Sequence, residues 1–597
     1  MQENRAFDHY FGTMAGVRGF KDPNVHISNN TNKPIWYQPT TSTVAEYLLP
    51  WWLTENPQYT DSTQCMIAGS NDWTPNHNSW DNGEVDGWVV NNTAWSWGHF
   101  RRSDLPVHFG IAEGWTIADM YAESVIGPTN PNRVSWASGT INFEGSPPGD
   151  PEVNGGPYIE NYELPGCESN GDVKYACYPL KWKTTPEYLE ANNISWFVYQ
   201  DVDNFDDNPF AHFEQYQTSS LWSDLRKKGL SYAGIDKFYS DCQSNSLPQV
   251  SYIIGPMELS EHPPFQPKDG AWLQKKIVDE FVNSPSYNNS VLFIMYDETG
   301  GLADHVEPFV SPRGTIGEWA FDPEDTTSYI PSGPGFRVPF YAISPYTRGS
   351  KVFTEPSDHS SQILFIEEWA KQALNISFTS TDMNVWRREH MSNLVNMFDF
   401  DHPNYTLPSI PEAETPSTLL GVYDGMAKCV LKYALLEDRR PPVPYGNQTE
   451  ETSLWTESGY KEVCGKLTEG RYLVFEQIIG DSAYTLFRNT SSDALDCIVP
   501  LTGGYKSATQ RFILHQIGDA FSTEFHIEAY GKSPVYLVDN TAFVKSLSKA
   551  DAYTIDFIPG LGYTIQSSSG LYLSALASGT AKFKNSVSYW NIYSVTY

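Results

Sequence analysis

The segment 290–296 constrains the fold more than any other part of this 597-residue chain. Its sequence, SVLFIMY, is a nearly continuous apolar run, which is typical of a strand buried on both faces of a sheet. Apolar residues at helical spacing precede it at 271–282, and the polar sequence DETGG follows at 297–301. Helix, buried strand and polar loop in this order predict carboxylates at the carboxyl end of a central strand, where open α/β sheets bind ligands.

Similar patterns recur over the first two thirds of the chain. A helical segment at 185–192 precedes the strand pattern SWFVYQ at 195–200, and another strand pattern, PFYAIS, lies at 339–344. Alternating helices and strands predict an α/β/α sandwich over residues 1–410. The polar motif at the start of the chain should itself follow a buried strand, so we expect a first strand and any signal sequence to precede it.

The pattern changes after residue 410. Residues 411–465 are mixed in character and rich in proline, and they are interpreted as a connector. From 466 to 597 the chain shows short strand patterns with turn signals, which predict a smaller all-β domain. The two segments 525–537 and 563–573 resemble each other, and this repetition suggests a trefoil-like barrel.

The charge balance excludes several classes of partner. With 72 acidic and 39 basic residues, the formal charge is −33. Nucleic acids and anionic membranes need basic surfaces, so neither is an expected partner. No run of about 18 apolar residues occurs, so we expect no integral membrane segment. The sequence gives no indication of the oligomeric state.

The cysteines and glycosylation motifs favour the secretory route. The seven cysteines lack metal-binding spacing, and Cys167 and Cys177 flank a short polar loop in a manner typical of a local disulfide. An odd total leaves at least one thiol unpaired. Acceptor motifs for N-glycosylation begin at Asn29, Asn91, Asn193, Asn288, Asn375, Asn404, Asn447 and Asn489. We therefore expect a secreted glycoprotein with disulfides.

Three short segments carry groups suited to phosphate chemistry. Glu3 and Asn4, taken alone, are typical turn residues, but their oxygens also suit a hard cation. Thr129 precedes a proline and lies at or near a helix N-terminus, where it is either a capping residue or a hydroxyl beside a phosphate-binding turn. Asp297 and Glu298 are either solvated loop carboxylates or ligands of a bound metal, because adjacent buried carboxylates are costly when unpaired.

Histidines form the fourth group. His77, His262 and His359 lie beside aromatic, proline or serine residues, and His305 follows an aspartate. A single histidine is usually incidental. Several gathered around one phosphate could donate hydrogen bonds and protonate a leaving oxygen.

The combination resembles the phospholipase C/acid phosphatase family, a branch of the alkaline-phosphatase-like superfamily. The matching stretches run in the family's order through most of the first 400 residues: ENRAFDHYFG at 3–12, HNSWDNGEVDGWV at 77–89, SDLPVHFGIAEGWTIADMYAESVIGPTNPNRVSWASGT at 103–140, SWFVYQD at 195–201, EHPP at 261–264, MYDETGGLADHV at 295–306 and SDHSSQILFIEEW at 357–369.

The resemblance implies an alkaline-phosphatase-like fold and a set of site residues. One divalent metal ion would be held by Glu3, Asn4, Thr129, Asp297 and Glu298. Since all of these are oxygen donors, Ca²⁺, Mg²⁺ or Mn²⁺ is expected before Zn²⁺. Asn4, His77, His262, His305 and His359 would face the phosphate, with Asp358 and His359 as candidates for bracing the site instead.

The expected mechanism is in-line attack by Thr129 on phosphorus, with His262 or His305 protonating the leaving alcohol and water resolving a phosphothreonine. The expected substrate is a phospholipid diester, because threonine at this position resembles the phospholipase side of the family and aromatic rings can stack on a choline group. The rings considered are Trp80, Trp88, Trp95, Trp97 and Trp115. A broad-specificity acid phosphomonoesterase remains the alternative, and a non-catalytic carbohydrate- or membrane-binding protein is a third.

Overall fold

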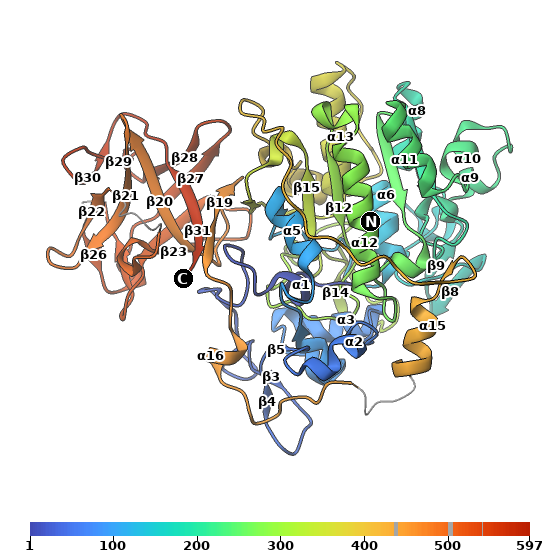
Figure 1. Cartoon of the computed structure of the whole chain (residues 1–597), viewed down its shortest axis with the longest axis horizontal. Coiled ribbons are helices and arrows are strands. Elements are labelled where there is room, and N and C mark those ends of the chain that lie inside the picture. Colours follow the sequence, from blue (N-terminus) through green and yellow to red (C-terminus); the bar gives the residue numbers. More distant parts are fainter. Residues whose placement is uncertain (68, 435–439, 500–504, 540) are drawn as a thin grey trace.

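The computed structural model describes residues 1–597 except 68, 435–439, 500–504 and 540 (Figure 1). It has a larger part that mixes helices and strands and a smaller part made of the strands from β20 onward. The predicted α/β class is confirmed. No helix among the described residues combines the length and apolar character needed to cross a bilayer.

A mixed sheet forms the centre of the larger part. β12 (Leu292–Met295) pairs antiparallel with β15 (Phe340–Ile343), and β15 pairs antiparallel with β7 (Thr116–Ala118). β16 (Lys351–Phe353) then runs parallel to β7. The predicted strands at 290–296 and 339–344 are therefore present and are direct neighbours.

The other edge of β12 faces a gap. β10 (Trp196–Gln200) and β11 (Val250–Ile254) form a separate parallel pair. The first residues of the chain lie between β11 and β12, because the Met1 amino group donates to the Ile253 carbonyl at 3.3 Å and the Gln2 N–H donates to the Met295 carbonyl at 2.8 Å. A cavity of about 880 Å³ continues between the two strands, lined largely by apolar side chains. Leu292 and Phe293 of β12 border it and are only half-buried, which differs from the predicted fully buried strand.

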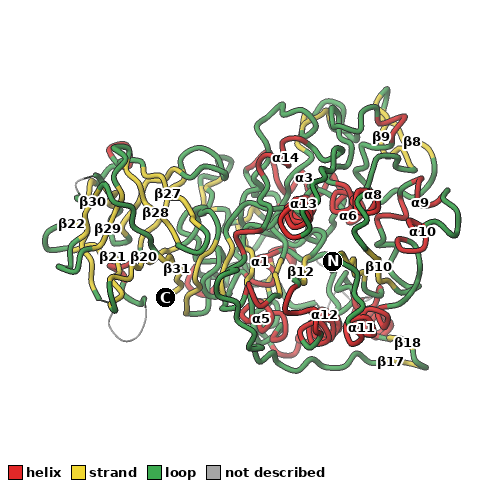
Figure 2. The backbone as a smooth tube through the Cα atoms, turned by 90° about the horizontal axis from the view of Figure 1, so that it is seen from above, coloured by secondary structure: helices red, strands yellow, loops and turns green. Residues whose placement is uncertain are grey.

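Helices cover both sides of these strands. Figure 2 shows α6 (Thr129–Ser138) and α13 (Ser360–Ala373) on one side of β10 and β12, with α5 (Pro106–Gly114), α11 (Ile235–Ser244) and α12 (Pro267–Val282) on the other. Other helices are α1 (Phe7–Phe11), α2 (Thr60–Thr63), α3 (Trp73–Trp80), α4 (Trp88–Asn91), α7 (Pro151–Asn154), α8 (Thr185–Ala191), α9 (Glu214–Gln217), α10 (Asp224–Gly229), α14 (Val385–His390), α15 (Gly425–Cys429) and α16 (Glu450–Ser453).

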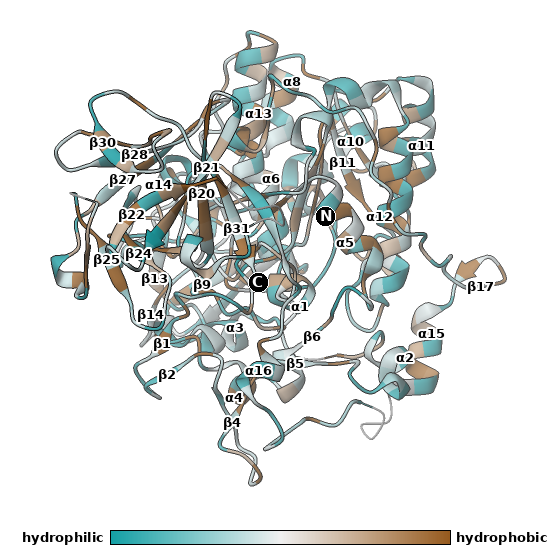
Figure 3. Ribbon diagram, turned by 60° about the vertical axis from the view of Figure 1, so that its left-hand side comes forward, coloured by the Kyte–Doolittle hydropathy of each residue, from teal (hydrophilic) through white to brown (hydrophobic). Residues whose placement is uncertain are grey.

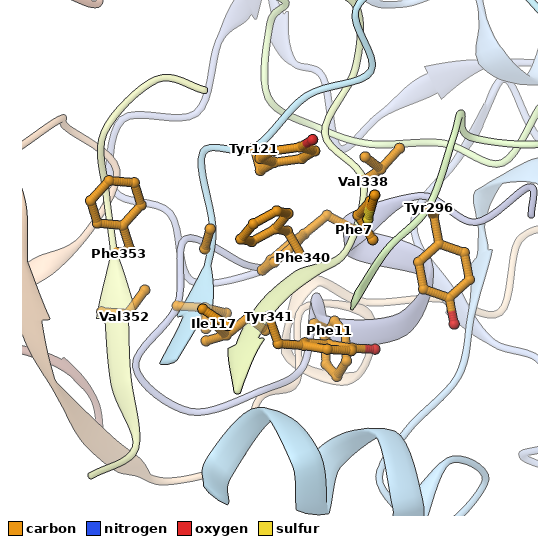
Figure 4. Close-up of a cluster of buried hydrophobic side chains, with 14 of the residues drawn as sticks. Phe7, Phe11, Ile117, Tyr121, Tyr296, Val338, Phe340, Tyr341, Val352 and Phe353 are labelled. Atoms are coloured by element: carbon orange, nitrogen blue, oxygen red, sulfur yellow. The ribbon is translucent and has the colours of Figure 1, made fainter. Parts of the chain in front are cut away.

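Aromatic residues of α1 and the sheet form the core beneath the N-terminal loop (Figure 4). The ring centroids of Phe11 and Tyr341 lie 5.8 Å apart, and those of Tyr121 and Phe340 lie 4.2 Å apart. All four side chains are fully buried. This packing fixes α1, and with it the loop of residues 2–5, against the central sheet.

The strands of the smaller part pair antiparallel in a mostly sequential order. They are β20 (Tyr472–Ile479), β21 (Ser482–Asn489), β22 (Ala494–Ile498), β23 (Phe512–Gln516), β24 (Glu524–Ala529), β25 (Val535–Leu537), β26 (Phe543–Val544), β27 (Tyr553–Ile558), β28 (Gly562–Ser567), β29 (Tyr572–Ala575), β30 (Ala581–Lys584) and β31 (Asn591–Thr596). The two similar segments are hairpin-like pairs, β24 with β25 and β28 with β29. Hydrophobic residues recur along β20 and β21 in Figure 3.

Strand pairing links the two parts. β19 (Gly459–Cys464), at the end of the segment interpreted as a connector, runs parallel to β16 and antiparallel to β31. A buried ion pair adds to this link, since Arg471 Nε lies 2.8 Å from Asp119 Oδ2. The junction is thus hydrogen bonded along a strand.

Two disulfides are present. Cys167–Cys177 confirms the predicted local bridge, and Cys65–Cys429 joins residues 364 positions apart. The three remaining cysteines, Cys242, Cys464 and Cys497, are buried thiols.

Candidate active site

Thr129 begins α6, as its predicted position at a helix N-terminus requires. The turn that leads into the helix is held by Asn132, whose amide group donates to the carbonyls of Val125, Gly127 and Pro128 and accepts from the Val125 N–H. The Thr129 hydroxyl is 6% exposed and donates to Glu3 Oε2 at 3.4 Å. A helix N-terminus with a hydroxyl at its first residue is suited to binding phosphate.

The N-terminal loop and the loop after β12 lie against each other. The Asn4 N–H donates to Asp297 Oδ1 at 3.0 Å, and the Arg5 N–H donates to the Glu298 carbonyl at 3.0 Å. A Cβ at Gly300, whose φ is +71°, would lie 2.5 Å from the Asn4 carbonyl oxygen. Only glycine permits this approach, so the DETGG sequence is what allows the two loops to pack.

Three oxygens of these two loops accept no hydrogen bond from any described residue. They are Glu3 Oε1, Asn4 Oδ1 and Asp297 Oδ2, all from buried residues. Buried acceptors without donors are costly unless a cation meets them. These oxygens, with the Thr129 hydroxyl, have the donor chemistry that Mg²⁺, Ca²⁺ or Mn²⁺ prefers. Four of the five predicted metal ligands are thus brought together in a way that fits such an ion.

The carboxyl group of Glu298, the fifth predicted ligand, is hydrogen bonded to other protein groups. Its Oε1 accepts from the Asn71 side chain at 2.7 Å and its Oε2 accepts from the Gly300 N–H at 2.5 Å. Burial, together with the negative charge of Asp297, raises the pKa of Glu298 well above its ordinary value. Its carboxyl group is therefore held by hydrogen bonds and faces Asn71 rather than Glu3.

A buried arginine supplies the positive charge at this place. Arg133, one turn along α6 from Thr129, forms ion pairs with Glu3 and with Asp297, whose Oδ2 lies 3.4 Å from the arginine Nε. The same guanidinium contacts Asp207 at 3.1 Å and donates to its carbonyl at 3.2 Å. Arg133 is 1% exposed, so these carboxylates, rather than water, are its ion-pair partners among the described residues.

Of the predicted histidines, His262 is the one with a ring nitrogen available. Its Nδ1 donates to the Pro263 carbonyl at 2.7 Å, and no described residue hydrogen bonds Nε2. Burial lowers the pKa of His262, while Asp297 opposes that effect. The ring is half-buried and packs edge-on against Phe205 with centroids 4.9 Å apart. Its neutral form thus offers a lone pair at Nε2.

The other three histidines have both ring nitrogens engaged. His77 faces the Trp73 and Pro331 carbonyls, His305 faces Asp8 and Asp22, and His359 faces the Tyr121 hydroxyl and the Asp297 carbonyl. In this arrangement none of the three offers a nitrogen to a phosphate. His359 instead supports the loop that carries Asp297, the bracing role considered for it. Asp358 lies in an ion pair with Arg387.

His305 belongs to a separate buried cluster. Asp8, Asp304 and His305 have ligand atoms within 4.8 Å of one another, a possible metal-binding group. Arg337 already lies between the two aspartates, at 3.0 Å from Asp8 Oδ1 and 2.8 Å from Asp304 Oδ1. Burial lowers the pKa of His305, but Asp8 and Asp22 outweigh it and raise the pKa overall. The cluster is therefore charge-matched by protein groups, and a cation there would have to compete with Arg337.

Three residues of the site were not singled out from the sequence: Asn71, Arg133 and Asp207. Arg133 stands four positions after Thr129, so helical spacing could have placed both on one face. Asn71 and Asp207 lie in irregular loops, and no local pattern indicates their positions.

Comparison with known proteins identifies the family. The Phosphoesterase family matches residues 1–371. The chain is 32% identical over 555 residues to the non-hemolytic phospholipase C of Pseudomonas aeruginosa, covering 89% of this chain and 74% of that protein. It is 30% identical over 495 residues to phospholipase C B of Mycobacterium tuberculosis, covering 76% and 87%. A match of this length makes the chain a phosphoesterase. The chain belongs to the Phosphoesterase family, as the sequence motifs predicted.

A plant protein also matches at lower identity. The non-specific phospholipase C4 of Arabidopsis thaliana is 23% identical over 474 residues, which is 72% of this chain and 75% of that protein.

Proposed function

We propose that this chain is a metal-dependent phosphodiesterase of the phospholipase C type that acts through Thr129. The observation that carries the proposal is the contact of the Thr129 hydroxyl with Glu3, together with three buried oxygens, from Glu3, Asn4 and Asp297, that accept no hydrogen bond from the described residues. Arg133 balances the charge of Glu3 and Asp297, but a purely structural role would still leave these oxygens without a hydrogen-bond donor among the described residues. A hydrolytic role explains both the hydroxyl and the oxygens.

Different protein groups bind the metal, attack phosphorus and orient the phosphate. When bound, a divalent cation lowers the pKa of a hydroxyl and offsets charge on a phosphate oxygen. Glu3, Asn4 and Asp297 would hold that cation, with Glu298 available if its carboxyl group turns from Asn71.

The Thr129 hydroxyl passes its proton to its acceptor, Glu3 Oε2, as its oxygen attacks phosphorus in line and the bond to the leaving alcohol oxygen breaks. Water then hydrolyses the phosphothreonine, and the threonine oxygen regains that proton. The Thr129 N–H at the start of α6 orients the phosphate, because the Asn130 N–H donates to Asn161 Oδ1 and Pro131 has no N–H.

His262 is the proposed proton carrier. Its Nδ1 proton is committed to the Pro263 carbonyl, so Nε2 is the atom that takes or gives a proton. Protonated at Nε2, it donates to the leaving alcohol oxygen, and the resulting neutral ring can take a proton from the attacking water. His305 keeps a supporting role through Asp8, and His77 and His359 act as bracing residues.

The diester preference rests on the relatives, which are named phospholipase C. The tryptophans considered as choline-stacking rings give it little support, because Trp80, Trp88, Trp97 and Trp115 are core residues and Trp95 packs partly buried beside Arg440. The aromatic ring beside His262 is Phe205 instead. An acid phosphomonoesterase, the alternative, would use the same nucleophile, metal-binding oxygens and histidine, so these residues do not separate the two activities.

One assay separates these possibilities. The full chain is incubated with p-nitrophenyl phosphorylcholine and with p-nitrophenyl phosphate, each with and without a chelator. We expect chelator-sensitive release from the diester that Mg²⁺, Ca²⁺ or Mn²⁺ restores. Preference for the monoester would move the assignment to an acid phosphatase, and release from neither would favour a binding protein.

We also propose the finer organisation expected from the sequence. Residues 1–410 are assigned to an alkaline-phosphatase-like catalytic domain and 466–597 to an accessory β domain of trefoil-like type, with 411–465 between them; 435–439, 500–504 and 540 lie outside the described residues. Secretion is supported by the two disulfides.

The cavity between β11 and β12 supports the expected additional strand. Among the described residues, β11 pairs as a strand only with β10 and β12 only with β15, so beyond the contacts of Met1 and Gln2 their facing edges have backbone groups that require partners. Gln2 already pairs in parallel with Tyr296, so an extended apolar segment running into Met1 would continue that pairing.

A further inference from the structure

The carboxylates that would hold the cation already have a positive partner in the protein. Glu3 and Asp297 are both fully buried, and the guanidinium of Arg133 forms ion pairs with each. A buried carboxylate without a counter-charge is strongly disfavoured. In the metal-free protein, therefore, Arg133 is the group that makes burial of these two side chains tolerable.

The hydrogen bonding shows that Arg133 is an incomplete partner. Glu3 Oε1 and Asp297 Oδ2 accept no hydrogen bond, and Arg133 Nε and Nη2 donate none, although their charges face one another. A structural arginine–carboxylate pair normally makes two parallel hydrogen bonds. The site thus matches the charge of the guanidinium without matching its donor geometry.

A third carboxylate provides an alternative place for the guanidinium. Asp207 lies on a different loop, and it contacts Arg133 through both its carboxylate and its carbonyl, at 3.1 and 3.2 Å. The Asp207 carbonyl accepts from Nη1, which contacts neither Glu3 nor Asp297, whereas the Asp207 carboxylate shares Nη2 with Glu3 and the contact with Asp297 uses Nε. Arg133 can therefore keep Asp207 as a partner while it gives up Glu3 and Asp297.

We infer that Arg133 and the divalent cation compete for Glu3 and Asp297, and that Asp207 retains the guanidinium once the cation has entered. Arg133 is then a positioning residue that sets the metal affinity: it stabilises the empty site and must be displaced before a metal can bind. Like charges repel, so a divalent cation bound to these carboxylates disfavours the guanidinium at the same place. This inference rests on the proposed metal-dependent function.

The competition predicts opposite effects for two variants. Arg133→Gln removes the competitor, so the metal-free protein should unfold at a lower temperature while the dissociation constant for Mn²⁺ falls at least ten-fold. Asp207→Asn removes the alternative partner of Arg133, so the guanidinium stays on Glu3 and Asp297 and Mn²⁺ binding should weaken several-fold. A residue with a merely structural role would weaken metal binding, or leave it unchanged, in both variants.

The experiment is a calorimetric titration of Mn²⁺ into the full chain, freed of metal with a chelator and dialysed, with thermal unfolding of the same samples. Unchanged or weaker Mn²⁺ binding by folded Arg133→Gln would overturn the competition. If that variant does not fold, Asp207→Asn decides, since unchanged affinity there also overturns it. Glu3→Gln serves as control: if wild-type protein binds no Mn²⁺, or Glu3→Gln does not weaken binding, the proposed metal site itself fails and the inference falls with it.

Discussion

The hydroxyl of Thr129 donates to Glu3 Oε2 at 3.4 Å, across a sequence separation of 126 residues. One group belongs to the first turn of α6 and the other to the loop that precedes α1. The contact exists because α1 is packed into the aromatic core while Asn132 holds the turn before α6. Two independently fixed elements therefore set the distance between the proposed nucleophile and a proposed metal ligand.

Thr129→Ala should abolish most of the activity without unfolding the protein. Loss of the nucleophile should reduce kcat by at least about 10²-fold, equivalent to roughly 3 kcal/mol of barrier. The side chain is small, so the unfolding free energy should change by no more than about 1 kcal/mol. Turnover of p-nitrophenyl phosphorylcholine and thermal unfolding measure the two effects. Thr129→Ser, which keeps a hydroxyl, is the matched control, and near-native turnover by the alanine variant would remove Thr129 from the mechanism.

Glu160 should make stability fall as pH rises. Its carboxylate accepts from the Trp73 N–H at 2.8 Å, and burial raises its pKa to about 8. Between about pH 4.3, where the unfolded group titrates, and about pH 8, the native state keeps a proton that the unfolded state has lost. As pH rises through that window, Glu160 therefore lowers the free energy of unfolding by on the order of 1 kcal/mol per pH unit at most.

Glu160→Gln, which cannot titrate, should flatten this decline. Melting temperatures recorded across the same window measure the effect, and the exposed Glu451 provides a control substitution. Parallel curves for wild type and Glu160→Gln would contradict the raised pKa.

Arg471→Met should destabilise the junction between the two parts of the molecule. Both Arg471 and Asp119 are 0% exposed, so the substitution leaves a buried carboxylate without its partner. Breaking such a pair typically costs about 3–5 kcal/mol. The comparison is Arg488→Met, in the pair with Asp493, whose side chains are 19% and 52% exposed and for which about 1 kcal/mol or less is expected. Urea unfolding that gave equal losses for both would show that the Arg471 pair contributes little.

An apolar strand-forming extension before Met1 should stabilise the chain. The extension would fill the cavity of about 880 Å³ and pair with the free edges of β11 and β12. We expect a higher melting temperature and less binding of a hydrophobic fluorescent dye than in the unextended protein, because apolar surface is removed from water. A glycine–serine extension of equal length is the control, and equal behaviour of the two would refute the additional strand.

The sequence predicted individual helices and strands better than it predicted which segments lie beside them. Periodicity identified β12 and α12 because each follows from side-chain alternation within one segment. It did not show that β12 has a free edge, since that depends on which residues lie beside it. For the same reason the proline-rich segment was interpreted as a connector although β19, at its end, joins the sheet.

In the candidate site, too, the sequence predicted features that depend on a local motif but not those that depend on distant residues. Glu3, Asn4, Thr129 and Asp297 could be named because their motifs are continuous in sequence and resemble a known family. His77 and His305 were expected at the phosphate, but their nitrogens bind Pro331 and Asp8, partners more than 250 positions away. Ring orientation is decided by such distant contacts, and a single sequence carries no signal for them.

The disulfide Cys65–Cys429 divides the molecule topologically into a covalent ring and two free arms. Thr129 and Asp297 belong to the ring, whereas Glu3 and Asn4 belong to the short arm before it. A protease that nicks the ring once releases no fragment until the bridge is reduced, but a cut beyond Cys429 frees the β-rich arm. Loss of the short arm would leave the ring covalently intact and deprive it of half of its proposed metal-binding oxygens.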